Sequence, residues 1–145
     1  MELTTASGII NFVEALEDTS AKFYESAAQR HGPLTDIFIS FAKENKKNVQ
    51  AVKRAYYSVI SDALEACFSF GTLLTTSYEI NVGLDDVVTR NELLQRAIDI
   101  ENTIHAFYKK GGESVVSHIE DIARIFKRLA RTHENRVSKL RDLKG

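Results

Sequence analysis

The stretch EDTSAKFY at residues 17–24 returns later in the chain as ENTIHAFY at residues 101–108. Both copies keep a glutamate, a threonine two residues after it, and a Phe-Tyr pair that begins six residues after it. Around each copy, apolar residues recur at alternating steps of three and four, which is the spacing of one face of an α-helix. The two segments are therefore predicted to be repeated amphipathic helices.

The segments that follow the two copies repeat as well. Each half of the chain therefore contains the same two helical patterns in the same order. We predict from this that the chain contains two similar helical hairpins. Residues 61–88 contain threonines, glycines and no sustained helical period, so they are predicted to form a long crossover between the hairpins. The matching stripes are Phe38, Phe41, Asn45, Asn48 and Val52 in the first hairpin and Phe126, Leu129, His133, Arg136 and Leu140 in the second.

Local signals mark the expected ends of four helices. Gly32-Pro33 is typical of a helix stop followed by a new start, and Gly111-Gly112 predicts another stop. Thr89-x-x-Glu92 and Ser117-x-x-Glu120 match the capping box of a helix start. The fold is therefore predicted to be all-α, with one four-helix bundle domain over residues 1–145. Its helices are expected at residues 7–30, 33–60, 89–110 and 117–143.

Composition limits the classes of function. The chain has 145 residues and one cysteine, Cys67, which excludes an internal disulfide and a Cys-x-x-Cys metal site. It has a formal net charge of −1, which argues against a nucleic-acid partner. The first residues lack a secretory signal pattern and no apolar run reaches the roughly 20 residues of a membrane span. A cytoplasmic protein without a membrane partner is expected.

Polar residues interrupt each apolar stripe at its middle. Burial of unpaired polar or charged groups costs on the order of several kcal/mol, so these residues must pair with one another or bind a ligand. The interrupting residues are Glu17, Asn45, Asn48, Glu101, His133 and Arg136.

At these residues the chain resembles the ferritin-like superfamily, in particular its rubrerythrin-like branch. That family holds two irons with one glutamate from each of two helices and a Glu-x-x-His pair from each of the other two. The resemblance implies that Glu17 and Glu101 stand at the single-glutamate positions. Asn45-x-x-Asn48 and His133-x-x-Arg136 stand at the Glu-x-x-His positions, so the ligand pattern is broken twice.

The charges of the residues at these ligand positions favour a protein that has lost the di-iron chemistry. Only two of the four carboxylates remain, and Arg136 adds a fixed positive charge that repels a cation and offers a donor fork to Glu17 or Glu101. This interpretation has no catalytic residue and no cofactor. It predicts a ferritin-like binding or structural module, not an enzyme.

The alternative is a metalloprotein with a rebuilt mononuclear site. Two carboxylates and one imidazole, from Glu17, Glu101 and His133, suit one divalent ion of Fe, Mn or Zn, with Asn45 or a water completing the coordination. Residual oxidoreductase activity with peroxide or dioxygen belongs to this alternative.

Expected partners follow from the surface. Ferritin-like bundles commonly associate through helix faces, so a homodimer is expected. Basic residues gather on the second and fourth helices, which could bind a small anion or an acidic protein partner. These basic residues are Lys43, Lys46, Lys47, Lys53, Arg54, Arg124, Lys127, Arg128, Arg131, Arg136, Lys139, Arg141 and Lys144.

Overall fold

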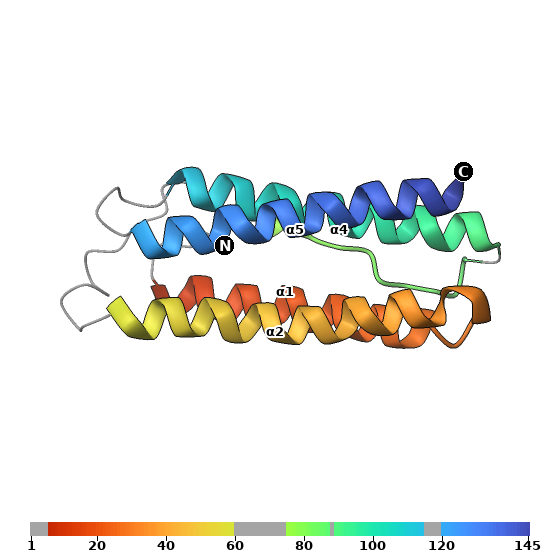
Figure 1. The fold of residues 1–145 in the computed structure, drawn as a ribbon, viewed down its shortest axis with the longest axis horizontal. Coiled ribbons are helices and arrows are strands. Elements are labelled where there is room, and N and C mark those ends of the chain that lie inside the picture. Colours follow the sequence, from red (N-terminus) through yellow and green to blue (C-terminus); the bar gives the residue numbers. More distant parts are fainter. Residues whose placement is uncertain (1–5, 60–74, 88, 115–119) are drawn as a thin grey trace.

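The computed structural model describes residues 6–59, 75–87, 89–114 and 120–145, and this part of the chain contains helices and no strand. Four long α-helices lie side by side (Figure 1). They are α1 (Ala6–Ala27), α2 (Thr35–Val59), α4 (Arg90–Ser114) and α5 (Glu120–Lys144). Two short 3-10 helices, η1 (Gly32–Leu34) and η2 (Thr75–Tyr78), lie in the connections.

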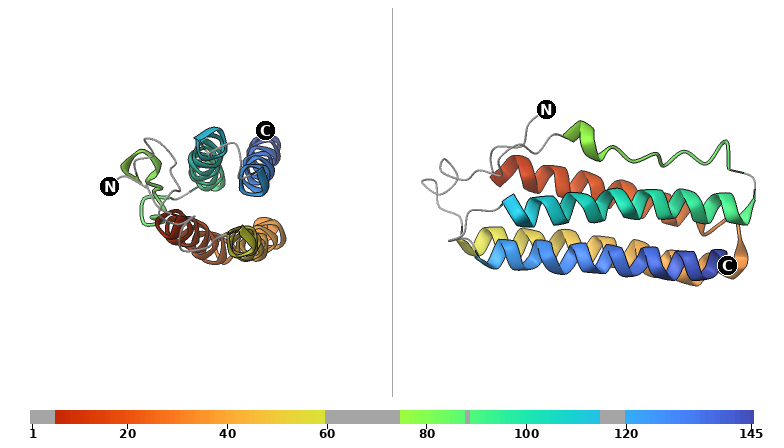
Figure 2. Two further views of the ribbon diagram at one scale, coloured as in Figure 1. Left: turned by 90° about the vertical axis from the view of Figure 1, so that its left-hand side faces the viewer. Right: turned by 90° about the horizontal axis from the view of Figure 1, so that it is seen from above.

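The crossover determines the direction of the helices. α1 and α2 form one antiparallel hairpin, and α4 and α5 form the other (Figure 1). Between them, η2 and residues 79–87 run back along the length of the helices, so that α2 and α4 point the same way (Figure 2). Two hairpins joined by one long connection are the topology that the sequence repeat predicted.

Aromatic side chains fix the register within each hairpin. The ring of Tyr24 on α1 lies 5.3 Å from the rings of both Phe38 and Phe41 on α2. In the other hairpin, the ring of Tyr108 on α4 lies 5.4 Å from that of Phe126 on α5. The tyrosine of each repeat therefore packs against a phenylalanine of the following helix.

Phe107 joins three elements of the core. Its ring lies 5.0 Å from that of Phe12 on α1 and 5.4 Å from that of Tyr78 on η2. It also lies 6.0 Å from the ring of Phe126 on α5.

Outside this core the helices carry charged faces, and no helix of the described ranges has a stretch apolar and long enough to cross a bilayer.

The helix α4 does not end at Gly111-Gly112, so that prediction was wrong. It continues to Ser114, and both glycines are buried. A Cβ added to Gly112 would lie 3.4 Å from the Cβ of Phe126 and 3.6 Å from the Cγ of Lys127. These are ordinary van der Waals distances, so Gly112 packs against α5, and this packing supports a helix that the two glycines alone would tend to end.

The other helix ends agree more closely with the prediction. The helix α1 ends at Ala27, three residues before the expected end, and the Thr35 hydroxyl donates to the Ala28 carbonyl at 2.6 Å. The Thr89 hydroxyl accepts a hydrogen bond from the Glu92 amide at 3.1 Å, as expected for a helix cap. The predicted start at Ser117, part of the crossover, and Cys67 lie outside the described residues.

Candidate functional site

The structure buries all six polar residues that interrupt the stripes, and we call them the polar layer. None of them is more than 6% exposed. Each helix contributes at least one, so the layer lies where both hairpins meet. The polar layer consists of Glu17 on α1, Asn45 and Asn48 on α2, Glu101 on α4, and His133 and Arg136 on α5.

His133 bridges the two buried carboxylates. Its Nε2 lies 2.8 Å from Glu17 Oε1, and its Nδ1 contacts Glu101 Oε2. A carboxylate can only accept hydrogen bonds, so each ring nitrogen must carry a proton to make both contacts. Between two ionised carboxylates, His133 must therefore be an imidazolium cation.

The electrostatics of the three residues agree with this charge state. Burial lowers the pKa of His133, but the carboxylates of Glu101 and Glu17 outweigh burial and raise that pKa to about 9. Burial raises the pKa of Glu101, but the positive charges of His133 and Arg136 outweigh it and bring that pKa to about 2. Glu101 is thus ionised and His133 protonated at neutral pH.

Arg136 uses all five of its N–H donors. Nη1 donates to Glu101 Oε1 at 3.0 Å and to Asn45 Oδ1 at 2.6 Å. Nη2 donates to the Phe41 carbonyl at 3.1 Å and to Glu44 Oε1 at 2.7 Å, and Nε donates to the same Glu44 oxygen at 3.0 Å. Of the two carboxylates proposed as partners from the sequence, the guanidinium therefore binds Glu101.

Glu44 is a partner that the sequence analysis missed. Its side chain is 47% exposed, whereas Arg136 and Glu101 are buried. Glu44 lies outside the core stripe of α2, so only the reach of Arg136 across to α2 brings the two together. The three-and-four spacing of buried residues could therefore not identify Glu44 as a partner of Arg136.

Each of the two tyrosines of the repeat donates a hydrogen bond to the glutamate of the other hairpin. Tyr24 on α1 donates to Glu101 Oε1 on α4 at 2.7 Å, and Tyr108 on α4 donates to Glu17 Oε1 on α1 at 2.8 Å. Burial, reinforced by the nearby carboxylates, raises the pKa of both tyrosines well above the usual value. Both hydroxyls therefore keep their protons and act as donors.

The buried charges of the polar layer cancel. Two carboxylates, Glu17 and Glu101, face two cations, His133 and Arg136. An ion network of this kind contributes little net stability compared with an apolar core, but loss of one member leaves an uncompensated buried charge. The four residues therefore depend on one another.

The candidate metal ligands Glu17, Glu101 and His133 do converge, as the sequence predicted. However, both ring nitrogens of His133 face carboxylate oxygens, so the protonated imidazole has no lone pair for a metal. No group of three or more His, Cys, Asp or Glu side chains in the described part of the chain is arranged to hold a metal ion. A cation could bind these three residues only after His133 lost a proton and turned.

The basic surface is smaller than the sequence suggested. Arg136 was counted as part of it, but this residue is 2% exposed and belongs to the polar layer. Lys46 pairs with Glu25 at 2.9 Å, and Lys53 pairs with Glu14 at 3.3 Å. The remaining exposed basic residues still lie on the outer faces of α2 and α5.

The expected homodimer stays a prediction. Among the described residues, Tyr57 on α2 is the only large hydrophobic side chain that is exposed. A dimer formed through the described helix faces would therefore use a mainly polar surface.

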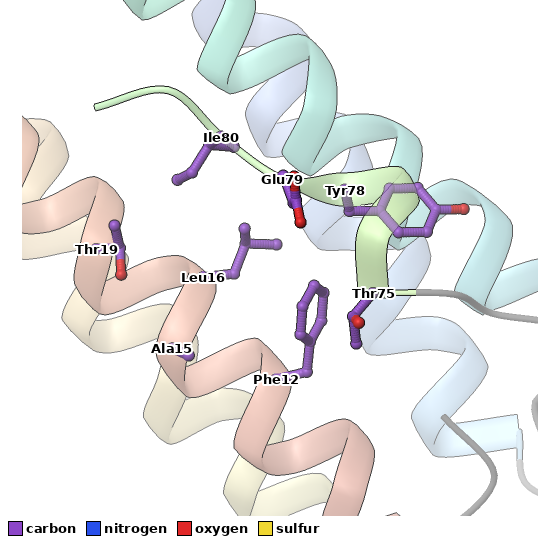
Figure 3. A pocket seen from close by; sticks show the side chains of 8 residues that line it. All are labelled: Phe12, Ala15, Leu16, Thr19, Thr75, Tyr78, Glu79 and Ile80. Atoms are coloured by element: carbon purple, nitrogen blue, oxygen red, sulfur yellow. The ribbon is translucent and has the colours of Figure 1, made fainter. Parts of the chain in front are cut away.

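A groove of about 460 Å³ lies between α1 and η2 (Figure 3). Among the described residues its lining is mainly apolar, with Glu79 as the one charged side chain. Such a lining suits an apolar group better than an anion. The lining residues are Phe12, Ala15, Leu16, Thr19, Thr75, Tyr78, Glu79 and Ile80.

Comparison with models of known protein families, with curated proteins and with solved structures finds no match to this chain. The resemblance to the ferritin-like superfamily therefore rests on the repeat and on the residues of the polar layer.

A matched pair of substitutions tests the charge balance. Glu101→Gln should lower the free energy of unfolding by about 3–5 kcal/mol, because it leaves two buried cations with one buried carboxylate. Glu44→Gln should cost less than about 1 kcal/mol, because Glu44 is half exposed. Urea denaturation of both variants measures the difference, and similar losses would contradict the charge balance.

The stability of the protein should depend on the protonation of His133. Its pKa is raised from 6.5 to about 9 in the folded chain, so its contribution is complete below about pH 6.5 and is lost as the pH rises through about 9. We expect a loss on the order of 3 kcal/mol across this window, measured by urea denaturation at several pH values. The variant His105→Gln is the control, because the His105 ring bonds the Ala130 carbonyl and lies outside the polar layer, so it should keep the same loss. An unfolding free energy that stays constant over this window would rule out the charged imidazole.

Proposed function

We propose that this chain is a ferritin-like bundle in which the charge-balanced polar layer replaces a metal centre. In this proposal the protein has lost di-iron redox chemistry and acts as a binding or structural module. The observation that carries the proposal is the contact of both ring nitrogens of His133 with Glu17 and Glu101. A histidine that donates from both nitrogens neutralises carboxylates and does not ligate a metal.

The position of Arg136 supports the same conclusion. The resemblance places this residue where the family has a ligand histidine, and here its guanidinium lies 3.0 Å from Glu101 Oε1. A divalent cation bound to Glu101 would face both this guanidinium and His133 at close range. Because buried charges are poorly screened, such a cation would be strongly repelled.

A protein of this kind would act through its surface. The polar layer gives a rigid interior, and the exposed basic residues of α2 and α5 would attract a small anion or an acidic protein partner. A homodimer would place two such surfaces in one assembly. The exposed basic residues are Lys43, Lys47 and Arg54 on α2 and Lys127, Arg128, Arg131, Lys139 and Arg141 on α5.

A mononuclear metal site is the second candidate. One observation favours it: Glu17 Oε2 is buried and has no hydrogen-bond partner within the described residues, so this oxygen is free to meet a ligand. The ligands would be Glu17, Glu101 and a deprotonated His133, and the metal would supply Lewis-acid or redox chemistry. Binding would then release protons and strengthen as the pH rises.

Metal content separates the two candidates. The protein is purified without chelator or affinity metal, exposed anaerobically to Fe(II), Mn(II) or Zn(II), desalted and analysed by mass spectrometry. We expect far less than one equivalent of metal per chain. The variant His105→Ala removes a half-buried surface histidine and controls for binding outside the polar layer. One equivalent that disappears in Glu17→Ala and Glu101→Ala, or two irons per chain, would overturn the proposal.

A further inference from the structure

Within the described residues, four buried polar atoms of Glu17, Ser20, Asn45 and Asn48 lack a hydrogen-bond partner. Glu17 Oε2 can only accept, the Ser20 hydroxyl can accept or donate, and the amide nitrogens of Asn45 and Asn48 donate. All four side chains are at least nine-tenths buried. Unpaired buried groups of this kind cost on the order of 1–3 kcal/mol each, so four of them together call for an explanation.

The register of the first hairpin brings these four residues together. Tyr24 on α1 packs against Phe41 on α2. In an antiparallel pair, one turn back from Tyr24 reaches Ser20, and one turn forward from Phe41 reaches Asn45. A further turn in each direction places Glu17 level with Asn48. This register places the four residues on facing turns of α1 and α2, and we refer to them as one patch.

The orientation of Asn45 within this patch is fixed. Its Oδ1 accepts a hydrogen bond from Arg136 Nη1 at 2.6 Å, so the amide nitrogen must point elsewhere. Glu17 is oriented as well, because its Oε1 accepts from His133 and Tyr108 and leaves Oε2 as the unused oxygen. The donor and the acceptor are therefore held in place by the ion network beside them.

The first hairpin carries smaller side chains at these positions than the second one does. By the sequence repeat, Ser20 on α1 corresponds to Ile104 on α4, which is fully buried. Asn48 on α2 likewise corresponds to Arg136 on α5. A serine and an asparagine occupy less volume than an isoleucine and an arginine, and both end in polar atoms.

We propose that one internal water molecule binds at this patch and completes the polar layer. Its two hydrogens go to Glu17 Oε2 and the Ser20 oxygen, and its two lone pairs accept from the amide nitrogens of Asn45 and Asn48. A buried water with two to four polar partners is a regular part of folded proteins. The proposal deepens the metal-free polar layer proposed above and rests on it.

Two measurements on the full chain test the water site. A high-resolution crystal structure with anomalous data should show one non-metal peak within hydrogen-bond distance of Glu17, Ser20, Asn45 and Asn48. In solution, magnetic relaxation dispersion of the water signal counts long-lived internal waters. Ser20→Ile fills the space with the side chain of the matching position and should remove one of them. Ser20→Ala keeps the space and three partners, so it should retain the water.

The outcomes separate this proposal from the proposed function. A direct contact of the Asn48 amide with Glu17 Oε2 and no peak between them would overturn the water site and leave the ion network intact. An equal water count in Ser20→Ile and in the unsubstituted protein would overturn it too. An anomalous metal peak bound by Glu17 would overturn both proposals.

Discussion

The neutralisation of two buried carboxylates is the constraint on which the rest of this bundle depends. Glu17 and Glu101 lie fully inside the core, and an unpaired carboxylate there would cost several kcal/mol. The imidazolium of His133 lies between them, and Arg136 supplies the second positive charge. Once these charges are present, Glu44 and the Phe41 carbonyl are needed to satisfy the remaining N–H groups of Arg136.

The two hairpins share one pattern but use it differently. The tyrosine contacts are equivalent in the two hairpins, because each tyrosine donates to the glutamate of the other repeat. The second helix of each hairpin breaks the symmetry: α5 carries the cationic pair, and α2 carries two asparagines at the matching positions. Arg136 reaches from α5 to α2, which ties the hairpins together, and the smaller side chains leave unpaired polar atoms between α1 and α2.

The sequence predicted the helices and the buried layer because both follow from periodicity. Steps of three and four residues identified Glu17 and His133 as interior, and the Thr89 cap followed from local hydrogen bonding. Periodicity could not foresee that Gly112 lies inside α4, since packing against α5 overrides the local signal for a helix stop there. It also could not assign Glu44 to Arg136 or show that both nitrogens of His133 meet carboxylates, because these contacts depend on atoms from different helices.

The charge of His133, a cation held between two carboxylates, can be measured at its two ring nitrogens. In nuclear magnetic resonance spectra of isotope-labelled protein at neutral pH, we predict that both Nδ1 and Nε2 carry a proton and that the ring loses one only near pH 9. A histidine ring with one unprotonated nitrogen at neutral pH would contradict the account. That nitrogen would then have a lone pair available for a metal ion.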